Sequence, residues 1–196
     1  MFVQTITGKV RDRDRFVREA ERWPAELKPG AKGYLGCTWG IAADGTAFMA
    51  ARFESADAAK HNADRPEQGE WWKQMEPALD APEFQDCAMV DTMMGGGSDD
   101  AGFVQVIVGR VKDEASARTM LQGAEAQLTT TRPDILGMTM AWHGDGGGFT
   151  QLVYFRSEDA ARTGERDDSG SDVDRDYQEM MAGEPTFIDL TEPHFD

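Results

Sequence analysis

The sequence predicts an α+β fold in which one βαββαβ unit occurs twice, as residues 2–90 and 103–190. Three observations predict it: the two stretches repeat each other, both show the same order of strand and helix patterns, and a glycine-rich segment separates them. A length of 196 residues fits two small domains. We therefore expect a first repeat at 1–94, a linker at 95–101 and a second repeat at 102–196.

The two copies match most closely at their first strands. Residues 2–12 and 103–113 are identical at seven of eleven positions, and two further positions exchange Lys with Arg. The offset between the copies is 101 residues at first; it becomes 102 after the glycine run at 146–148 and 103 at the last predicted strand. Because order, spacing and identity agree along the whole unit, the pattern indicates an internal duplication.

Each copy follows the element order of the ferredoxin-like fold. In the first copy we expect strands at about 2–10, 33–41, 46–54 and 84–90, and a helix at about 13–27 where apolar residues recur at helical spacing. The dipeptide Asp44-Gly45 is typical of a hairpin turn. Ser55 and Ser157 stand where the N-cap of a helix is expected.

The first strand of the second copy indicates a sheet that is covered on both sides. Phe103, Gln105 and Ile107 alternate with three valines, so neither face of the strand is polar. The helices of the unit would cover one face, and the sheet of the other copy would cover the other. We therefore predict two ferredoxin-like sheets that pair as an intramolecular dimeric α+β barrel. Since one chain completes this barrel, a monomer is expected.

The composition argues against several classes of function. The formal net charge is −16, and an acidic surface repels phosphate backbones and anionic lipids, so neither nucleic acid nor membranes are expected partners. The chain has no run of about 18 apolar residues. Its first residues lack the features of a signal peptide, so a cytoplasmic location is expected. Cys37 and Cys87 belong to no CxxC motif and are expected to be buried thiols at opposite sheet edges.

Three stretches carry a resemblance that covers essentially the whole chain. They are Asn62-Ala-Asp-Arg-Pro-Glu-Gln-Gly-Glu-Trp-Trp72, Gly95-Gly-Gly-Ser-Asp-Asp-Ala-Gly-Phe-Val-Gln105, and Arg132-Pro-Asp followed by His143-Gly-Asp-Gly-Gly-Gly-Phe149. With them the sequence resembles the dimeric α+β barrel superfamily that includes antibiotic-biosynthesis-type monooxygenases, and more narrowly an actinobacterial group of tandem-barrel proteins. The resemblance implies small-molecule chemistry in a pocket between sheet and helices, often oxygenation without a metal or organic cofactor. Other branches degrade haem, or only bind and assemble.

The copies differ most in their second helical region, and this difference predicts a pocket in the first copy. Residues 60–75 contain His61, Asn62, Arg65 and the pair Trp71-Trp72, whereas residues 162–171 have neither a histidine nor an aromatic pair. Asn62, Arg65 and one tryptophan would line the pocket, because neighbouring side chains on a helix point about 100° apart. His61 is the candidate proton carrier, although a helical histidine is more often a surface residue.

Other residues of this region and of the strands have competing explanations. Asp64, Pro66 and Glu67 have the spacing of a capping box that restarts a helix. Gln4 and Gln105 share their strand face with apolar residues, and a buried amide must be hydrogen-bonded, either within the fold or to a ligand. Both glutamines are therefore candidate ligand-binding residues.

His143 is a further candidate, just before the glycine run 144–148. That run lacks the Lys and Ser/Thr of a phosphate-binding loop and joins two strands, so it predicts a hairpin turn. No clustered Cys/His pattern predicts a metal site.

Three functions remain open. The first is an enzyme or binder of the cofactor-independent monooxygenase type, in which an apolar or aromatic substrate supplies electrons to O₂ while the protein positions it and stabilises its anion. The second is a non-catalytic barrel that binds a hydrophobic ligand or a protein partner. The third is a haem-handling barrel, which needs an axial ligand, and His61 or His143 would have to supply it.

Overall fold

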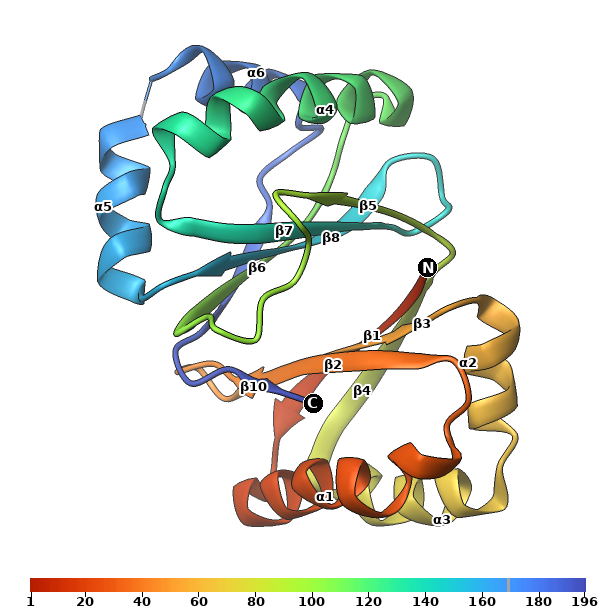
Figure 1. Cartoon of the computed structure of the whole chain (residues 1–196). Coiled ribbons are helices and arrows are strands. Elements are labelled where there is room, and N and C mark those ends of the chain that lie inside the picture. The colour runs from red at the N-terminus through yellow and green to blue at the C-terminus, as the bar shows by residue number, and fades with distance from the viewer. Residues whose placement is uncertain (169) are drawn as a thin grey trace. The chain divides into compact units, whose positions relative to one another are not determined.

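The structure, a computed structural model, describes residues 1–168 and 170–196 and divides into two compact units (Figure 1). One unit comprises Met1–Ala88 with His194–Asp196, and the other comprises Met89–Pro193. Ser169, part of the predicted contrast between residues 60–75 and 162–171, lies outside the described residues.

The first unit is a five-stranded antiparallel sheet with helices against it. Its strands lie in the order β10-β2-β3-β1-β4, which is the ferredoxin-like order 4-1-3-2 with one strand added at an edge. The elements are β1 (Phe2–Val10), α1 (Arg13–Glu26), a 3₁₀ turn (Lys28–Gly30), β2 (Tyr34–Ile41), β3 (Thr46–Phe53), α2 (Ala56–Ala63), α3 (Pro66–Met75), a second 3₁₀ turn (Glu76–Ala78), β4 (Leu79–Cys87) and β10 (His194–Phe195).

The second unit repeats this arrangement, so the predicted α+β fold with two ferredoxin-like repeats is confirmed. Its strands lie in the order β5-β7-β8-β6-β9, again with one strand added at the edge. The elements are β5 (Met89–Met93), β6 (Phe103–Arg110), α4 (Glu114–Thr131), β7 (Ile135–Trp142), β8 (Gly148–Phe155), α5 (Glu158–Asp168), α6 (Asp172–Met180) and β9 (Thr186–Leu190).

The helix starts lie where the sequence predicts them, and for the predicted reason. The Ser55 and Ser157 hydroxyls each accept a hydrogen bond from the backbone N–H three residues on, at 3.1 and 3.2 Å. The carboxylates of Asp12 and Asp113 do the same for the first helix of each copy, at 3.0 and 2.7 Å. These bonds satisfy donors that a helix leaves unpaired at its N-terminus. The duplication therefore extends to the caps.

The predicted last strand of the first copy, 84–90, is wrong at both ends. Strand β4 begins at Leu79, and residues 89 and 90 belong to β5, which pairs with β7. The strand begins earlier than predicted because Pro82 lies on an edge strand, where a residue without an N–H is tolerated. A register shift between Thr7 and Lys9 of β1 absorbs the irregular backbone at Ala81, whose φ is +45°.

The predicted capping box is also wrong. Asp64 ends helix α2, and its carboxylate accepts a bond from Lys60 Nζ at 2.6 Å instead of capping α3. Arg65 precedes α3 and contributes no side-chain capping bond. Pro66 does begin α3, as its fixed φ favours. The carboxylate of Asp64 was available to a lysine one helical turn earlier, and that contact replaces the cap.

The last strand of each copy is followed by a short strand that joins the other unit's sheet. Strand β5 follows β4 along the chain but pairs with β7 of the second unit. Strand β10 follows β9 but pairs with β2 of the first unit, through His194 with Trp39 and Phe195 with Thr38. The predicted ranges 1–94 and 102–196 follow the repeat along the chain and do not include this exchange. The exchange places Asp196 beside β2 of the first unit.

Each unit has a hydrophobic core between its sheet and its helices. In the first unit Phe16, Ala20 and Trp23 of α1 are buried at the predicted helical spacing. In the second unit both faces of β6 are buried, since Phe103 and Val104 are fully inaccessible. Cys37 and Cys87 are buried free thiols, as expected.

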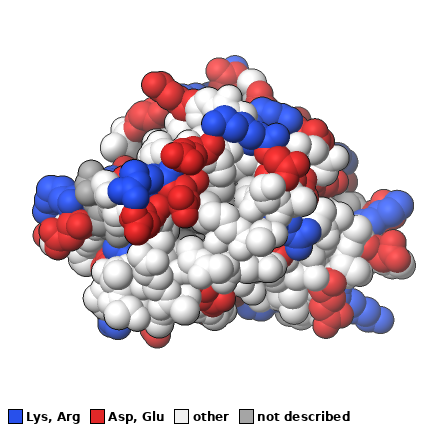
Figure 2. Space-filling model, turned by 90° about the horizontal axis from the view of Figure 1, so that it is seen from above, with Lys and Arg blue, Asp and Glu red and all other residues white. Residues whose placement is uncertain are grey.

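The surface carries charges of both signs. Figure 2 shows one face, on which acidic and basic side chains are interspersed with uncharged ones. Within the described residues, no helix has both the length and the apolar character that a membrane crossing requires.

Candidate functional site

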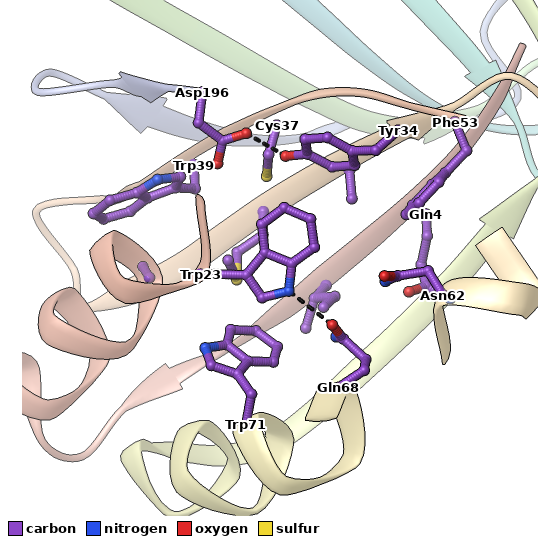
Figure 3. A pocket seen from close by; sticks show the side chains of 14 residues that line it. Gln4, Trp23, Tyr34, Cys37, Trp39, Phe53, Asn62, Gln68, Trp71 and Asp196 are labelled. Carbon is purple, nitrogen blue, oxygen red and sulfur yellow. Dashed lines mark hydrogen bonds between the residues drawn. The ribbon is translucent and has the colours of Figure 1, made fainter. Parts of the chain in front are cut away.

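The first unit encloses a cavity of about 60 Å³ between its sheet and its helices (Figure 3). Its walls are mainly aromatic and come from α1, α3 and strands β2 and β3. The aromatic lining consists of Trp23, Tyr34, Trp39, Phe53 and Trp71. Five polar or thiol side chains interrupt this wall: Gln4, Cys37, Asn62, Gln68 and Asp196. An apolar pocket with a few convergent polar groups is the usual form of a small-molecule site.

A carboxyl–phenol pair is the most distinctive feature of this cavity. Tyr34 Oη donates a short hydrogen bond to Asp196 Oδ1, drawn as a dashed line in Figure 3. The backbone N–H of Asp196 donates to the carbonyl of Cys37 at 3.3 Å, so the exchanged strand β10 positions the carboxyl. On the same strand, the His194 ring stacks on Trp39 with centroids 3.9 Å apart.

Burial shifts the acid–base properties of this pair. It raises the pKa of the Asp196 carboxyl above its ordinary value, and the Tyr34 hydrogen bond and the nearby Lys28 oppose that rise. Burial also raises the pKa of the Tyr34 hydroxyl and raises the pKa of the neighbouring Cys37 thiol to about 12. A carboxyl with a raised pKa in an aromatic cavity is a candidate for proton transfer.

The amide side chains around the cavity are only partly satisfied within the fold. Asn62 Oδ1 accepts from Arg65 Nη1 at 2.9 Å, while its amide nitrogen has no hydrogen bond to any described residue. Gln4 Nε2 donates to Asp86 Oδ1 at 2.8 Å. The Gln68 oxygen accepts from the Trp23 indole at 2.7 Å. Asn62 can therefore still donate to a ligand.

The structure separates the residues that the sequence grouped around this site. Trp71 lies in the wall and donates its indole N–H to the carbonyl of Glu19 at 2.8 Å. Trp72 lies outside the cavity and packs on Phe84, with ring centroids 5.0 Å apart. Arg65 does not line the cavity either: its guanidinium donates to the Leu27 carbonyl and to Asn62, so it positions that amide.

Both candidate histidines lie away from this cavity. His61 is exposed on α2, and its Nδ1 lies 3.0 Å from the Asp57 carbonyl of the same helix. His143 Nε2 lies 2.9 Å from Thr150 Oγ1 in the second unit, and burial lowers the pKa of its ring. Within the described residues, no group of His, Cys, Asp and Glu side chains is placed to hold a metal ion. The haem-handling alternative named these two histidines. His61 lines neither of the cavities between sheet and helices, whereas His143 borders a separate hollow of about 360 Å³ in the second unit.

The second unit also has a cavity between its sheet and its helices, and this cavity is larger than that of the first unit. Its volume is about 160 Å³, and Gln105 is among its lining residues. Two substitutions between the copies explain the difference. Ala124 occupies the position of Trp23 at the offset of 101, and Ile135 occupies that of Tyr34. Smaller side chains on the same frame leave more empty space.

Two important residues, Tyr34 and Asp196, were not among the sequence candidates. The repeat held a signal for Asp196, because the offset of 103 aligns residues 192–196 with β5. On that alignment Asp196, directly after β10, corresponds to Met93, the last residue of β5. The sequence contained no sign that these strands join the other unit's sheet.

No protein-family model and no curated protein matches this sequence. Solved structures do match its fold. A proposed monooxygenase from Lactobacillus acidophilus is similar with a TM-score of 0.71 and 14% identity, covering 100% of this chain and 98% of the other. A proposed monooxygenase from Fusobacterium nucleatum gives a TM-score of 0.71 at 10% identity, with 98% and 93% covered. An anthrone oxidase-like protein gives 0.68 at 11% identity, with 100% and 92% covered.

The chain has two ferredoxin-like units in tandem, a fold that matches these solved structures along nearly their whole length. The matches span both units, so the predicted α+β fold with two ferredoxin-like repeats is confirmed, and it resembles the fold of proteins described as proposed monooxygenases. At these identities the likeness concerns the fold. What the chain binds or catalyses depends on its own side chains.

Proposed function

We propose that the tandem barrel binds a flat aromatic molecule with an enolisable group in the cavity of the first unit and promotes its reaction with O₂ without a cofactor. The observation that carries this proposal is the Tyr34–Asp196 pair, which opens into an aromatic cavity. The fold shared with proposed monooxygenases and with an anthrone oxidase-like protein supports it.

In the proposed reaction, Asp196 accepts a proton from the substrate, and the resulting enolate transfers electrons to O₂. A methylene group of the substrate becomes a carbonyl. One atom of O₂ enters that carbonyl, and the other leaves as water with the two substrate hydrogens. The substrate supplies all four electrons, so no external reductant is required. Burial raises the pKa of the Asp196 carboxyl, which makes its carboxylate a stronger base than an exposed aspartate.

The other polar groups have supporting roles in this proposal. The amide nitrogen of Asn62 donates to the enolate oxygen, where negative charge develops. Arg65 holds Asn62 in that orientation through the 2.9 Å bond to its Oδ1. The indole rings of Trp39 and Trp71 form the walls against which an aromatic substrate packs.

Substrate entry requires part of the wall to move. A cavity of about 60 Å³ holds a few water molecules, whereas sites for drug-sized ligands measure roughly 300–1,000 Å³. Two parts of the wall are the candidates for this movement. Strand β10 is joined to β2 by two residue pairs, and Trp23 is tied to Gln68 by one side-chain hydrogen bond. Displacement of either one would widen the cavity.

The test is oxygen uptake by the full chain with anthrone as the probe, in buffer treated with a metal chelator. We expect protein-dependent conversion of anthrone to anthraquinone above the rate of autoxidation. Asp196→Asn should lower this rate about 10²-fold or more, the usual contribution of a positioned base. Asp80→Asn, which alters an exposed carboxylate paired with Arg11, is the matched control and should keep the wild-type rate.

A second candidate is non-catalytic binding of an apolar ligand. It is favoured by the internal pairing of Trp23 with Gln68 and of Tyr34 with Asp196, which leaves fewer polar groups for chemistry. Quenching of tryptophan fluorescence by anthrone without oxygen uptake would support this candidate and contradict the first.

We further propose that the chain acts as a monomer, which sedimentation velocity tests directly.

A further inference from the structure

The second unit contains a cavity large enough for a one-ring molecule. Its volume is about 160 Å³, and an apolar cavity of about 150 Å³ in another protein accepts benzene. Helix α4, strand β7 and helix α6 supply most of the wall. The apolar lining consists of Ile107, Met120, Leu121, Ala124, Leu128, Ile135, Met138, Val153, Phe155 and Val173.

A glutamine in this cavity has unused hydrogen-bonding capacity. Gln151 is 4% exposed and pairs with Ile107 across the sheet, at the position that Met49 occupies opposite Ile6 in the first unit. Its Oε1 accepts from the Tyr177 hydroxyl at 3.0 Å. Within the described chain, the one contact of its amide nitrogen is Met138 Sδ at 3.7 Å. A thioether is a weak acceptor, so the amide donors are poorly satisfied.

Two of the three charged side chains that line this cavity form ion pairs. The Arg132 guanidinium donates to the Asp134 carboxylate at 2.7 Å. Glu165 accepts from Arg162 at 3.1 Å. The third, the Asp174 carboxylate, accepts from the Gly170 backbone N–H at 2.9 Å, and its negative charge disfavours an anionic ligand. The Gln151 amide is the uncharged donor that can select a ligand with a hydrogen-bond acceptor.

We propose that the second unit binds a compact, uncharged molecule of about one aromatic ring that carries a hydrogen-bond acceptor. The acceptor takes a bond from Gln151 Nε2, and the ring occupies the space that Trp23 and Tyr34 fill in the first unit. This site is separate from the proposed oxygenation site. The tandem barrel therefore has two ligand cavities with different chemistry, one in each copy.

The test compares two ligands of similar shape, acetophenone and isopropylbenzene, by titration into the isotopically labelled full chain with NMR detection. Acetophenone carries a carbonyl acceptor, and isopropylbenzene has a methyl group in its place. We expect saturable shifts at residues of the second cavity with both ligands, at dissociation constants of about millimolar or below. Acetophenone should bind roughly 2- to 10-fold more tightly, the equivalent of one net hydrogen bond.

The variant Gln151→Met replaces the glutamine with the residue that the first copy has at this position, so the fold can be expected to accept it. It should remove the preference for acetophenone and leave isopropylbenzene binding within about 2-fold of wild type. A second variant, Ala124→Leu, fills the cavity and should weaken both ligands at least about 5-fold.

Asp80→Asn, which alters an exposed carboxylate of the first unit, is the control and should leave both affinities unchanged. Three outcomes would overturn the proposal: no saturable binding at 10 mM ligand (about the limit of such titrations), shifts confined to the first unit, or an unchanged ligand preference in Gln151→Met. Because these experiments measure binding in the second unit, their failure does not depend on whether anthrone is oxidised.

Discussion

The cavities of the two units occupy equivalent places in the repeat but have different linings. In both units a glutamine of the first strand donates to an aspartate of the neighbouring edge strand. Gln4 reaches Asp86 at 2.8 Å and Gln105 reaches Asp189 at 3.1 Å. The helix caps and the strand order are repeated as well. The frame has therefore been kept in both copies, and these glutamines have a structural role in it.

The two units differ in the side chains that line the space between sheet and helices. The first cavity is narrowed by Trp23 and Tyr34, and the second is widened by Ala124 and Ile135. The exchanged strands differ too, because Asp196, directly after β10, corresponds to Met93 at the end of β5. A carboxyl therefore enters the first cavity and a thioether stands in its place in the second unit. The first cavity therefore contains a carboxyl–phenol pair, and the second has more empty space.

The largest expected effect is on stability, when the first cavity is made to resemble the second. Trp23→Ala introduces the residue found at position 124. It should lower the free energy of unfolding by about 3–5 kcal/mol, because a large buried side chain is lost and a cavity remains. Urea denaturation measures this loss. Trp72→Ala is the matched control: its ring is partly exposed outside the cavity, and the loss should be no more than about half as large. Equal losses would contradict the assigned packing.

Arg65 should have the next largest effect, through the groups that it contacts. Arg65→Ala removes the donors to the Leu27 carbonyl and to Asn62 Oδ1, and should cost about 1–3 kcal/mol of unfolding free energy. If Arg65 also positions Asn62 for the enolate, kcat for anthrone oxidation should fall while KM changes little. Arg65→Lys should restore part of the stability. A normal kcat in Arg65→Ala would assign this arginine a structural role alone.

Asp196 should make a pH-dependent contribution to stability. Burial raises the pKa of its carboxyl in the folded protein, so the folded state binds this proton more tightly than the unfolded state. Its contribution is fully present below the unfolded pKa of about 4 and is lost as pH rises through the folded pKa. Asp196→Asn does not titrate, so its unfolding free energy relative to wild type should rise with pH above about 4. Urea denaturation at several pH values tests this, and a pH-independent difference would contradict the raised pKa.

The smallest effect is expected at His61. Its ring is exposed and contacts its own helix, outside both cavities. His61→Ala should change the unfolding free energy by no more than about 0.5 kcal/mol and leave oxygen uptake at the wild-type rate. A large loss of activity would identify this histidine as a proton carrier after all and would weaken the assignment of Asp196.

The sequence predicts most of the strands, helices and helix caps because local residue patterns specify them and both copies carry the same patterns. Strand alternation, helical spacing and the N-caps at Ser55 and Ser157 are properties of neighbouring residues, and the repeat confirms each of them independently. The local prediction failed at Asp64, where a lysine one turn away competed for the same carboxylate. It failed again at β4, where an edge strand tolerates Pro82.

What the sequence determined by itself is therefore the duplicated ferredoxin-like fold and the place between sheet and helices where each cavity forms. The tertiary structure decided which side chains enter those cavities. Asp196 reaches Tyr34 across 162 positions of sequence because β10 pairs with β2. Gln151 of β8 likewise meets Tyr177 of α6, 26 positions further along the chain. Such contacts join residues that are far apart in the chain, and no local pattern of charge or hydrophobicity specifies them.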